Sequence, residues 1–401
     1  MKKIKFTIFI IVFAQFCCTS LWFATNAILS ELLINFKLNE NALEHLTSAV
    51  QFGFIIGTLL FAILSIADRF SPSKVFFICA FLGAGINLGT ILETNNFFSL
   101  ILIRFSSGFF LAGIYPVGMK IASDYSDKGL GKALGFLVGA LVLGTAFPHF
   151  LNGLLFKISW QTVILATSFI ALLGGLLILL FVPNGPYRKR NYKPAFKTGR
   201  VIFKNPELRT AAIGYFGHMW ELYTFWAFVP IILSTYFSFH NSDLPNISLL
   251  SFIIIGVGSL ACIIGGLLCN SFGEKKIART ALLLSGCCCL LSPILFYTES
   301  SLVFISFLIF WGMVVVADSP LFSTLVAQNS PAEYRATSLT LVNSIGFAIT
   351  IVSIQCISII SNYIDPKFLY LILGIGPIIG VIALFQNTQN PLAKSEIGRN
   401  K

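Results

Sequence analysis

Two short polar stretches lie at equivalent places in the two halves of this 401-residue chain. The first reads LSIADRFSPSK over residues 64–74, and the second reads GLLCNSFGEKK over residues 266–276, 202 positions later. Aligning them places Asp68 opposite Asn270, with basic residues just beyond in both copies. A polar residue at the membrane edge followed by a tight turn and Lys or Arg suits a short cytoplasmic connection between membrane helices. Their recurrence at half the chain length indicates an internal duplication.

The sequence around these stretches is apolar enough to cross a membrane many times. Hydrophobic residues make up 56 % of the chain and charged residues 11 %, against roughly 25 % charged in an average soluble domain. Apolar runs of about 20 residues are long enough to span a bilayer as helices. We expect such spans at about 6–33, 46–66, 75–93, 98–122, 133–156, 161–182, 210–236, 247–269, 280–297, 301–326, 337–361 and 367–386.

The predicted fold class is therefore an all-α integral membrane protein, with twelve transmembrane helices in two pseudo-symmetric six-helix bundles. Short loops leave no room for a sizeable soluble domain, which excludes a cytosolic enzyme, a secreted disulfide scaffold and a nucleic-acid binder. We also find no HExxH, no GxSxG and no pair of Asp at catalytic spacing, so a membrane-embedded enzyme is not expected.

The net charge of +11 follows from where the basic residues fall. With the N-terminus in the cytoplasm, 23 of the 27 Lys and Arg residues lie on the cytoplasmic side. Only Lys37, Lys157 and Lys367 lie in loops on the other side, and Arg104 is inside a span. Membrane proteins show this bias generally. We therefore expect both termini in the cytoplasm and a multi-pass protein of a bacterial inner membrane.

A basic stretch after the sixth span divides the chain. It holds eight Lys and Arg residues between positions 187 and 209, which suits a linker that lies against anionic lipid headgroups. We expect one bundle at 1–186, a cytoplasmic linker at 187–208, and the second bundle with a short tail at 209–401. All nine Cys lie in apolar runs without zinc-type spacing, so we expect packing roles for them, no metal site and no cofactor.

The two loop stretches resemble a signature of the major facilitator superfamily. That family has the pattern G-x-L-a-D-r-x-G-r-k between its second and third spans. Residues 266–276 fit it, apart from Asn270 at the Asp position, and include Gly273 at a glycine position. The first copy keeps Asp68 and Arg69 but lacks the glycines. The resemblance implies that Asp68, Arg69, Asn270 and Gly273 belong to a motif that helps to hold one conformation, with the Asp near a helix N-terminus.

A second pattern of that family, R-x-x-q-G-x-x-x-a in the fourth span, is matched by Arg104, Ser107, Gly108 and Ala112. The resemblance covers the whole chain. It implies a secondary transporter that works by alternating access, with spans 1, 4, 7 and 10 lining a central cavity between the two bundles.

Ionisable side chains inside spans are costly and mark candidate functional sites. Here Arg104, His218, Glu221 and Asp318 all fall in the spans that the resemblance places around the cavity. Each has a structural alternative. Arg104 is close enough to the outer end of its span to snorkel, His218 can be a structural partner of Glu221 at i+3, and Asp318 can serve helix packing or gating.

Polar and aromatic residues in the first and fourth spans complete the predicted site. If the first span is one continuous helix, Gln15, Trp22 and Asn26 share a face with Thr19 and Ser30. Tyr115 shares a face of the fourth span with Arg104. The predicted substrate-binding or proton-coupling residues are therefore Glu221, His218, Arg104, Asp318, Asn26, Trp22, Gln15 and Tyr115.

A carboxyl group in a low-dielectric environment can exchange a proton near neutral pH. We therefore expect proton-coupled uptake of a small anionic or zwitterionic solute, with Glu221 as the coupling residue and Arg104 as a fixed positive charge. Proton-coupled efflux of a drug or metabolite, and a non-transporting sensor on the same fold, stay open as alternatives. The expected partners are the solute, H⁺ and the lipid bilayer, without nucleic acid, and we expect a monomer.

Overall fold

The computed structural model describes residues 2–39, 41–125, 130–154, 159–188, 204–331 and 335–386. Throughout these residues the regular secondary structure is helical. Eleven helical segments in this part of the chain are long and apolar enough to span a membrane. The helix at the N-terminus, whose apolar part is Phe6–Thr19, is shorter, and together with the helices that follow it makes the twelfth span. The prediction of twelve membrane-spanning helices is confirmed.

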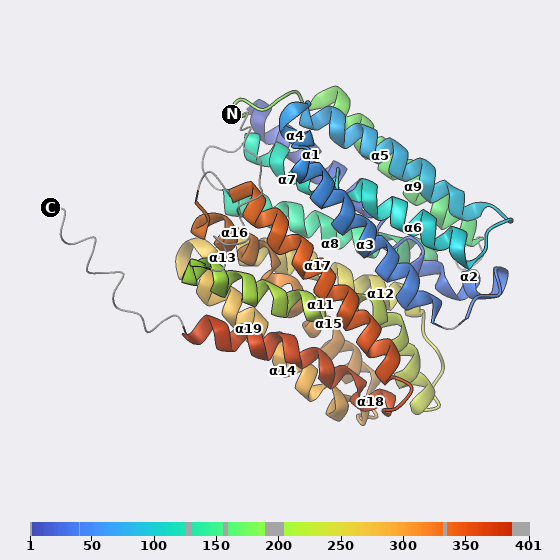
Figure 1. Ribbon diagram of the computed structural model, residues 1–401. Coiled ribbons are helices and arrows are strands. Elements are labelled where there is room, and N and C mark those ends of the chain that lie inside the picture. The colour runs from blue at the N-terminus through green and yellow to red at the C-terminus, as the bar shows by residue number, and fades with distance from the viewer. Residues whose placement is uncertain are drawn as a thin grey trace.

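The first half of the chain forms one bundle, shown in blue to green in Figure 1. Prolines and polar caps begin several of its helices: Pro72 starts one helix, and Asn96 forms a capping box with Ser99 at another. Its elements are α1 (Lys2–Thr19), η1 (Asn26–Ile28), α2 (Leu29–Asn35), α3 (Ala42–Ile63), α4 (Ile66–Arg69), α5 (Pro72–Leu88), η2 (Gly89–Ile91), α6 (Phe97–Leu111), α7 (Tyr115–Asp124), α8 (Leu130–Leu154) and α9 (Trp160–Phe181).

The second half forms the other bundle, from green to red in Figure 1. Its first helix starts at Pro206, with Asn205 as the N-cap. Its elements are α11 (Pro206–Phe239), α12 (Ile247–Gly256), α13 (Gly258–Phe272), α14 (Glu274–Phe296), α15 (Ser301–Ala317), α16 (Ser319–Asn329), α17 (Arg335–Ile360), α18 (Pro366–Leu369), η3 (Tyr370–Gly374) and α19 (Ile375–Gln386).

The two halves repeat each other in detail at an offset of 204 residues. Gly108 of α6 lies against α3, where an added Cβ would overlap the carbonyl oxygen of Val50. Gly312 of α15 lies in the same way against the carbonyl oxygen of Ile254 in α12. Small residues at such crossings let two membrane helices approach closely. The duplication predicted from the loops therefore extends to the helix crossings.

The bundles meet where α3 packs on α17, and where α8 packs on α12, α13 and α16. We call the end where α1 begins and α19 ends the terminal face, and the other end the opposite face (Figure 1). Near the opposite face, four hydrogen bonds of neutral groups join the bundles, here named the opposite-face seal: Asn152 to Ser248 (3.1 Å), Asn246 to the carbonyl of Gly153 (2.7 Å), and Gln355 to Ser48 (2.9 Å) and to the carbonyl of Glu44 (3.3 Å).

Several spans are broken where the sequence predicts continuous helices, and among them the eighth breaks at Val257, between α12 and α13. The first stops at Thr19 and resumes only at η1, the fourth breaks between α6 and α7, and the tenth breaks at Asp318. The predicted stripe of Gln15, Trp22 and Asn26 on one continuous helix is therefore wrong, and Ser30 is exposed. Hydropathy reports that a segment is apolar, but it does not report where the backbone leaves the helix.

The predicted boundaries 1–186, 187–208 and 209–401 stay predictions. Most of the basic linker, residues 189–203, and the tail from 387 onward lie outside the described residues.

Candidate functional site

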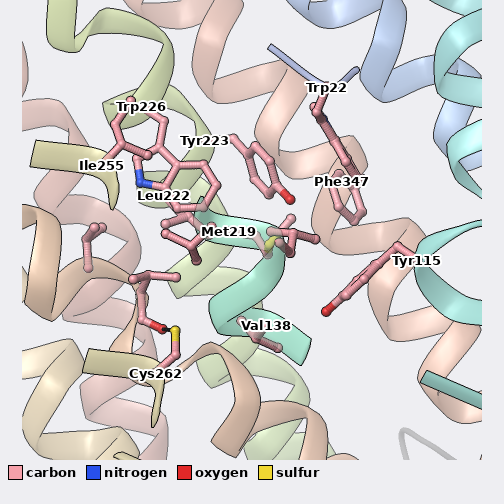
Figure 2. Packing of buried hydrophobic residues seen from close by; sticks show 14 of the residues in the cluster. Trp22, Tyr115, Val138, Met219, Leu222, Tyr223, Trp226, Ile255, Cys262 and Phe347 are labelled. Carbon is pink, nitrogen blue, oxygen red and sulfur yellow. Dashed lines mark hydrogen bonds between the residues drawn. The ribbon is translucent and has the colours of Figure 1, made fainter. Parts of the chain in front are cut away.

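A small cavity lies between the bundles, with room for about one water molecule. Its wall is aromatic and aliphatic, and Tyr115, Tyr215, Tyr223 and Ser319 bring hydroxyl groups to it. Figure 2 shows Tyr115 and Tyr223 on either side of Met219. The lining residues are Tyr115, Val138, Leu141, Tyr215, Met219, Leu222, Tyr223, Trp226, Val316, Ser319 and Phe347.

A cluster of aromatic rings from both bundles, the aromatic barrier, adjoins the cavity. Trp22 stacks on Tyr223 and on Phe347, each with ring centroids 5.6 Å apart. Phe54 packs on Phe347 at 4.5 Å, so rings from opposite bundles interlock. The barrier residues are Trp22, Phe23, Phe54, Tyr223, Trp226 and Phe347. Together with the opposite-face seal, these contacts close the path between the bundles toward the opposite face.

Glu221 lies behind the cavity wall, fully buried inside the second bundle. One carboxylate oxygen accepts hydrogen bonds from Trp311 Nε1 (2.6 Å) and from Cys289 Sγ (3.3 Å). The other oxygen accepts one from Ser285 Oγ (2.9 Å). These donors come from α14 and α15 and satisfy a carboxyl group that would otherwise be costly to bury.

His218 and Asp318 form a second buried pair. The distance between His218 Nδ1 and Asp318 Oδ1 is 2.8 Å, and each side chain is 1 % exposed. Asp318 is the N-cap of α16, yet its side chain does not cap that helix; it lies against the imidazole instead. The alternative reading, in which His218 is a structural partner of Glu221, does not hold, because each residue has its own partners. The role of His218 in binding or coupling stays a prediction.

The helix α11 carries Glu221 and His218 on a different face from the one that lines the cavity. Tyr215, Met219 and Tyr223 recur at steps of four and face the cavity. His218 and Glu221 lie on another face of the same helix, toward α14 to α16. The ring of Tyr215 packs 5.9 Å from that of His218, centroid to centroid. One helix thus carries the cavity wall on one side and the titratable groups on another.

Arg104 is fully buried and does not snorkel to an interface. Its guanidinium donates to the carbonyl oxygens of Leu21 (3.0 Å) and Trp22, in the break of the first span. It does not line the cavity. The contact that the structure shows for Arg104 is with the backbone of the first span. A contact with a substrate stays a prediction.

Among the remaining predicted residues, Tyr115 lines the cavity. Trp22 belongs to the aromatic barrier. Asn26 donates to Thr47 Oγ1 (2.9 Å) inside the first bundle. Gln15 is fully buried against Gly118, where an added Cβ would overlap its side-chain oxygen. The structure therefore divides the predicted set between cavity, barrier and bundle interior.

The loop motif lies at the terminal face. Asp68 Oδ1 is 2.8 Å from Lys120 Nζ, in the second half of α7. Arg188 donates to the carbonyl oxygens of Asp68 (3.2 Å) and Phe70 (2.7 Å), and Arg69 ends α4. Asp68 is thus paired with a lysine side chain, and the expected contact with a helix N-terminus stays a prediction.

In the second copy of this motif, Gly273 separates α13 from α14 and adopts a φ of 80°. Left-handed backbone of this kind favours glycine. Asn270 lies in α13, and its side chain is outside the described part. The conformational role of these motif residues stays a prediction.

Residues 11–354 match the family model of the Major Facilitator Superfamily. The chain belongs to this superfamily. It is accordingly a multi-pass membrane transporter rather than an enzyme, as the sequence predicts, and the two six-helix bundles are the superfamily fold.

Two further comparisons agree with the superfamily assignment. The fold is similar to that in "The structure of the MFS (major facilitator superfamily) proton:xylose symporter XylE bound to 6-bromo-6-deoxy-D-glucose", with a TM-score of 0.77 over 96 % of both chains at 13 % identity. A 190-residue segment is 21 % identical to the "Probable L-galactonate transporter" of Escherichia coli (strain K12), and covers 43 % of this chain. The match spans only 41 % of that relative's length.

Several residues of the site have no signal in the sequence. Ser285 and Cys289 lie in the ninth span and contact Glu221, so the expectation of a pure packing role for the cysteines is wrong for Cys289. Tyr215 and Phe347 are aromatic residues in a chain with 41 Phe and 11 Tyr. Helical spacing places Tyr215 and Glu221 on different faces of one helix. It does not tell which of the two faces meets the cavity.

Proposed function

We propose that this transporter is a proton-coupled symporter for a small, hydroxylated organic anion, such as a sugar acid. The observation that carries the proposal is the two-sided helix α11. It places Tyr215, Tyr223 and Trp226 in the cavity wall and holds Glu221 and His218 behind that wall. Occupation of the cavity and protonation behind it therefore act on the same helix.

The cavity wall supports a hydroxylated solute. Tyrosine and serine hydroxyls both donate and accept hydrogen bonds, and the aromatic faces beside them suit the C–H groups of a carbon skeleton. Trp226 Nε1 is buried and has no hydrogen-bond partner among the described residues, so it offers a donor to a ligand. The printed name of the L-galactonate relative supports a hydroxylated carboxylate as the substrate class.

Glu221 is the proposed proton site. Its carboxylate takes three hydrogen bonds from donors on two other helices. Protonation removes one acceptor position and weakens these bonds, because bonds to a charged group are stronger than bonds to a neutral one. The packing of α11 on α14 and α15 thereby depends on the proton. His218 and Asp318 form a second proposed site, since this pair can also gain or lose a proton.

The proposed direction of transport combines the charge distribution, which places the termini, with proton symport. If the termini are cytoplasmic, as the basic loops predict, the opposite-face seal closes the periplasmic side and the cavity belongs to the inward-facing half of the cycle. Inward movement of H⁺ down its gradient then drives uptake of the solute across a bacterial inner membrane.

The test is proton flux in proteoliposomes that contain a pH-sensitive dye. The solutes are C6 aldonates and the aldoses and polyols that match them in hydroxyl number. With an aldonate, wild type is expected to acidify the vesicle interior. Glu221→Gln is expected to abolish acidification, because an amide in the same position cannot take up the proton. Exchange of labelled solute is expected to persist in Glu221→Gln, since the cavity wall is unchanged.

The matched control is Glu93→Gln, the same change at an exposed glutamate outside the cavity wall and outside the opposite-face seal. It is expected to acidify the vesicles like wild type. Proton flux in Glu221→Gln equal to that in wild type would remove Glu221 from the coupling step. Loss of both flux and exchange in Glu221→Gln would assign this residue to folding or binding.

A second candidate is symport of a neutral hydroxylated solute, a sugar or polyol. The observation in its favour is that no Lys or Arg lines the cavity, so no fixed cation is there to bind a carboxylate. The same assay decides between the candidates: flux with aldoses but not with aldonates favours the neutral solute. Outward movement of solute against proton entry would favour efflux.

A further inference from the structure

The first span breaks without a residue that would force it to break. Residues 20–25 read SLWFAT, without Gly or Pro, yet they lie between α1 and η1. A break at membrane depth frees backbone carbonyls from their helical partners, and an unpaired carbonyl in an apolar environment costs several kcal/mol. Something outside the span must therefore satisfy the carbonyls of the break.

Arg104 supplies those hydrogen bonds. Two different guanidinium nitrogens reach the carbonyl oxygens of two consecutive residues, Leu21 and Trp22. The side chain is completely buried. Among the described residues, no Asp or Glu forms an ion pair with it. Its positive charge thus faces carbonyl dipoles instead of a counter-ion.

This arrangement is the one that a bound cation has in other broken helices. In transporters with discontinuous spans, freed carbonyls and helix C-terminal ends coordinate cations. Here α1 presents its C-terminal end and the carbonyls just beyond it, and the guanidinium occupies that place. Arg is suited to it because its planar fork offers several donors in fixed directions and keeps its charge.

We propose that Arg104 is a tethered cation that holds the break in the first span, and that it thereby positions Trp22 in the aromatic barrier. The same residue whose carbonyl accepts from Arg104 carries the indole that stacks on Tyr223 and Phe347. Fixing this carbonyl fixes the direction in which the indole leaves the backbone. Arg104 is thus a positioning residue, and it does not contact the solute.

The test uses Arg104→Ala and free guanidinium at about 10 mM, far below its denaturing range. Removing the side chain opens space beside the carbonyls, which guanidinium can refill. Arg104→Ala is expected to lower the thermal unfolding temperature of the purified protein and to reduce solute exchange at least about tenfold, equivalent to 1.4 kcal/mol. Guanidinium is expected to restore both in part and to leave wild type unchanged.

Two controls separate this role from a general need for arginine. Arg335 also donates to a carbonyl, that of Ala327 (2.8 Å), but its side chain is exposed. Arg335→Ala is expected to show no response to guanidinium. The second control is Na⁺ at the same concentration with Arg104→Ala. Recovery with Na⁺ equal to that with guanidinium would overturn the forked geometry and make the break an inorganic cation site.

If Arg104→Ala does not fold, Arg104→Lys serves in its place, combined with Trp22→Ala in a double-mutant cycle. We expect Arg104→Lys to slow exchange in the wild-type background and to add little once Trp22 is gone. Additive losses would contradict positioning through Trp22. This inference rests on the proposed function only for the exchange readout. Recovery of the unfolding temperature by guanidinium tests it even where no tested solute is transported.

Discussion

The two bundles share a scaffold but differ in the charges that they bury. Gly108 and Gly312 occupy the same helix crossing, and Pro116 and Pro320 follow the same break, each pair 204 residues apart. The first bundle buries Arg104 on a broken helix. The second has Leu308 at the equivalent position, and it buries Glu221 and His218 of α11 together with Asp318, which lies between α15 and α16.

The two halves thus share the residues that set helix packing, while the residues that carry charge differ between them. Trp22 and Trp226 match at the same offset, yet the span around Trp22 is broken while α11 continues past Trp226 to Phe239. An arginine keeps its charge at every accessible pH, whereas carboxyl and imidazole groups titrate. We therefore expect the charge of Arg104 to be fixed, and the groups around Glu221 and His218 to respond to protons.

Moving the arginine to the other bundle has the largest expected effect. Leu308→Arg places a guanidinium at the position that matches Arg104. Because α11 is unbroken at Phe225, that carbonyl keeps its helical partner, and only the Trp226 carbonyl is freed, since Pro230 has no N–H to donate to it. An unpaired buried charge costs about 3–5 kcal/mol. We expect little monodisperse protein on size-exclusion chromatography. The control Leu308→Met changes shape at nearly constant volume and is expected to cost under about 1.5 kcal/mol. Equal yields of the two variants would contradict the comparison.

Removing the shared glycines has the next largest expected effect, and it should be alike in both halves. In Gly108→Ala and in Gly312→Ala, the new Cβ meets a backbone carbonyl of the helix it crosses. Overpacking of this kind costs about 1–3 kcal/mol. Thermal unfolding in detergent measures it.

The control for both glycines is Gly85→Ala, where nothing lies within 4 Å of the added Cβ. There the change is expected to stabilise the helix by roughly 0.5–1 kcal/mol. A tolerated Gly312→Ala beside a damaging Gly108→Ala would show that the crossings are not equivalent.

The smallest expected effect is at the helix caps of the opposite face. Asp365 accepts the Lys367 backbone N–H (3.0 Å), which holds the pKa of the Asp365 carboxyl below its ordinary value. A lowered pKa in the folded state stabilises above the unfolded value near 3.9, and this contribution is lost as the pH falls through the folded value. Asp365→Ala should therefore lower the unfolding temperature by roughly 1 °C at pH 7, and by less below pH 4.

The neutral cap of the first bundle is the matched control. Asn96 accepts the Ser99 backbone N–H (2.9 Å) without a titratable group. The loss in Asn96→Ala is expected to be the same at pH 7 and at pH 4. A pH-dependent loss in Asn96→Ala would show that the difference lies elsewhere in the protein.

The sequence was sufficient for the spans and insufficient for their breaks. Hydropathy marks apolar runs of membrane length, and the repeated loop motif predicts the duplication. Residues 20–25 carry no Gly or Pro, so nothing local predicts that the first span stops at Thr19. The break is stabilised by Arg104, 82 and 83 residues away, and such a contact is visible only once the helices are packed.

The site shows the same limit. Glu221 and Asp318 stand out because ionisable residues are rare inside spans. Their surroundings depend on rotation of the helices: Trp311 shares a face with Asp318 by spacing, yet it donates to Glu221. The cavity wall is aromatic, and aromatic residues are too frequent in this chain for any one of them to stand out before the structure is known.

The opposite-face seal is made of amides, hydroxyls and backbone carbonyls, without an ion pair among its four bonds. Neutral hydrogen bonds contribute roughly 0.5–1.5 kcal/mol each. Salt screens interactions between charges, so it weakens these neutral bonds little. Opening on that side breaks these bonds and the ring contacts of the aromatic barrier, and neither kind of contact is an ion pair. Opening should therefore proceed equally well in dilute and in salty medium.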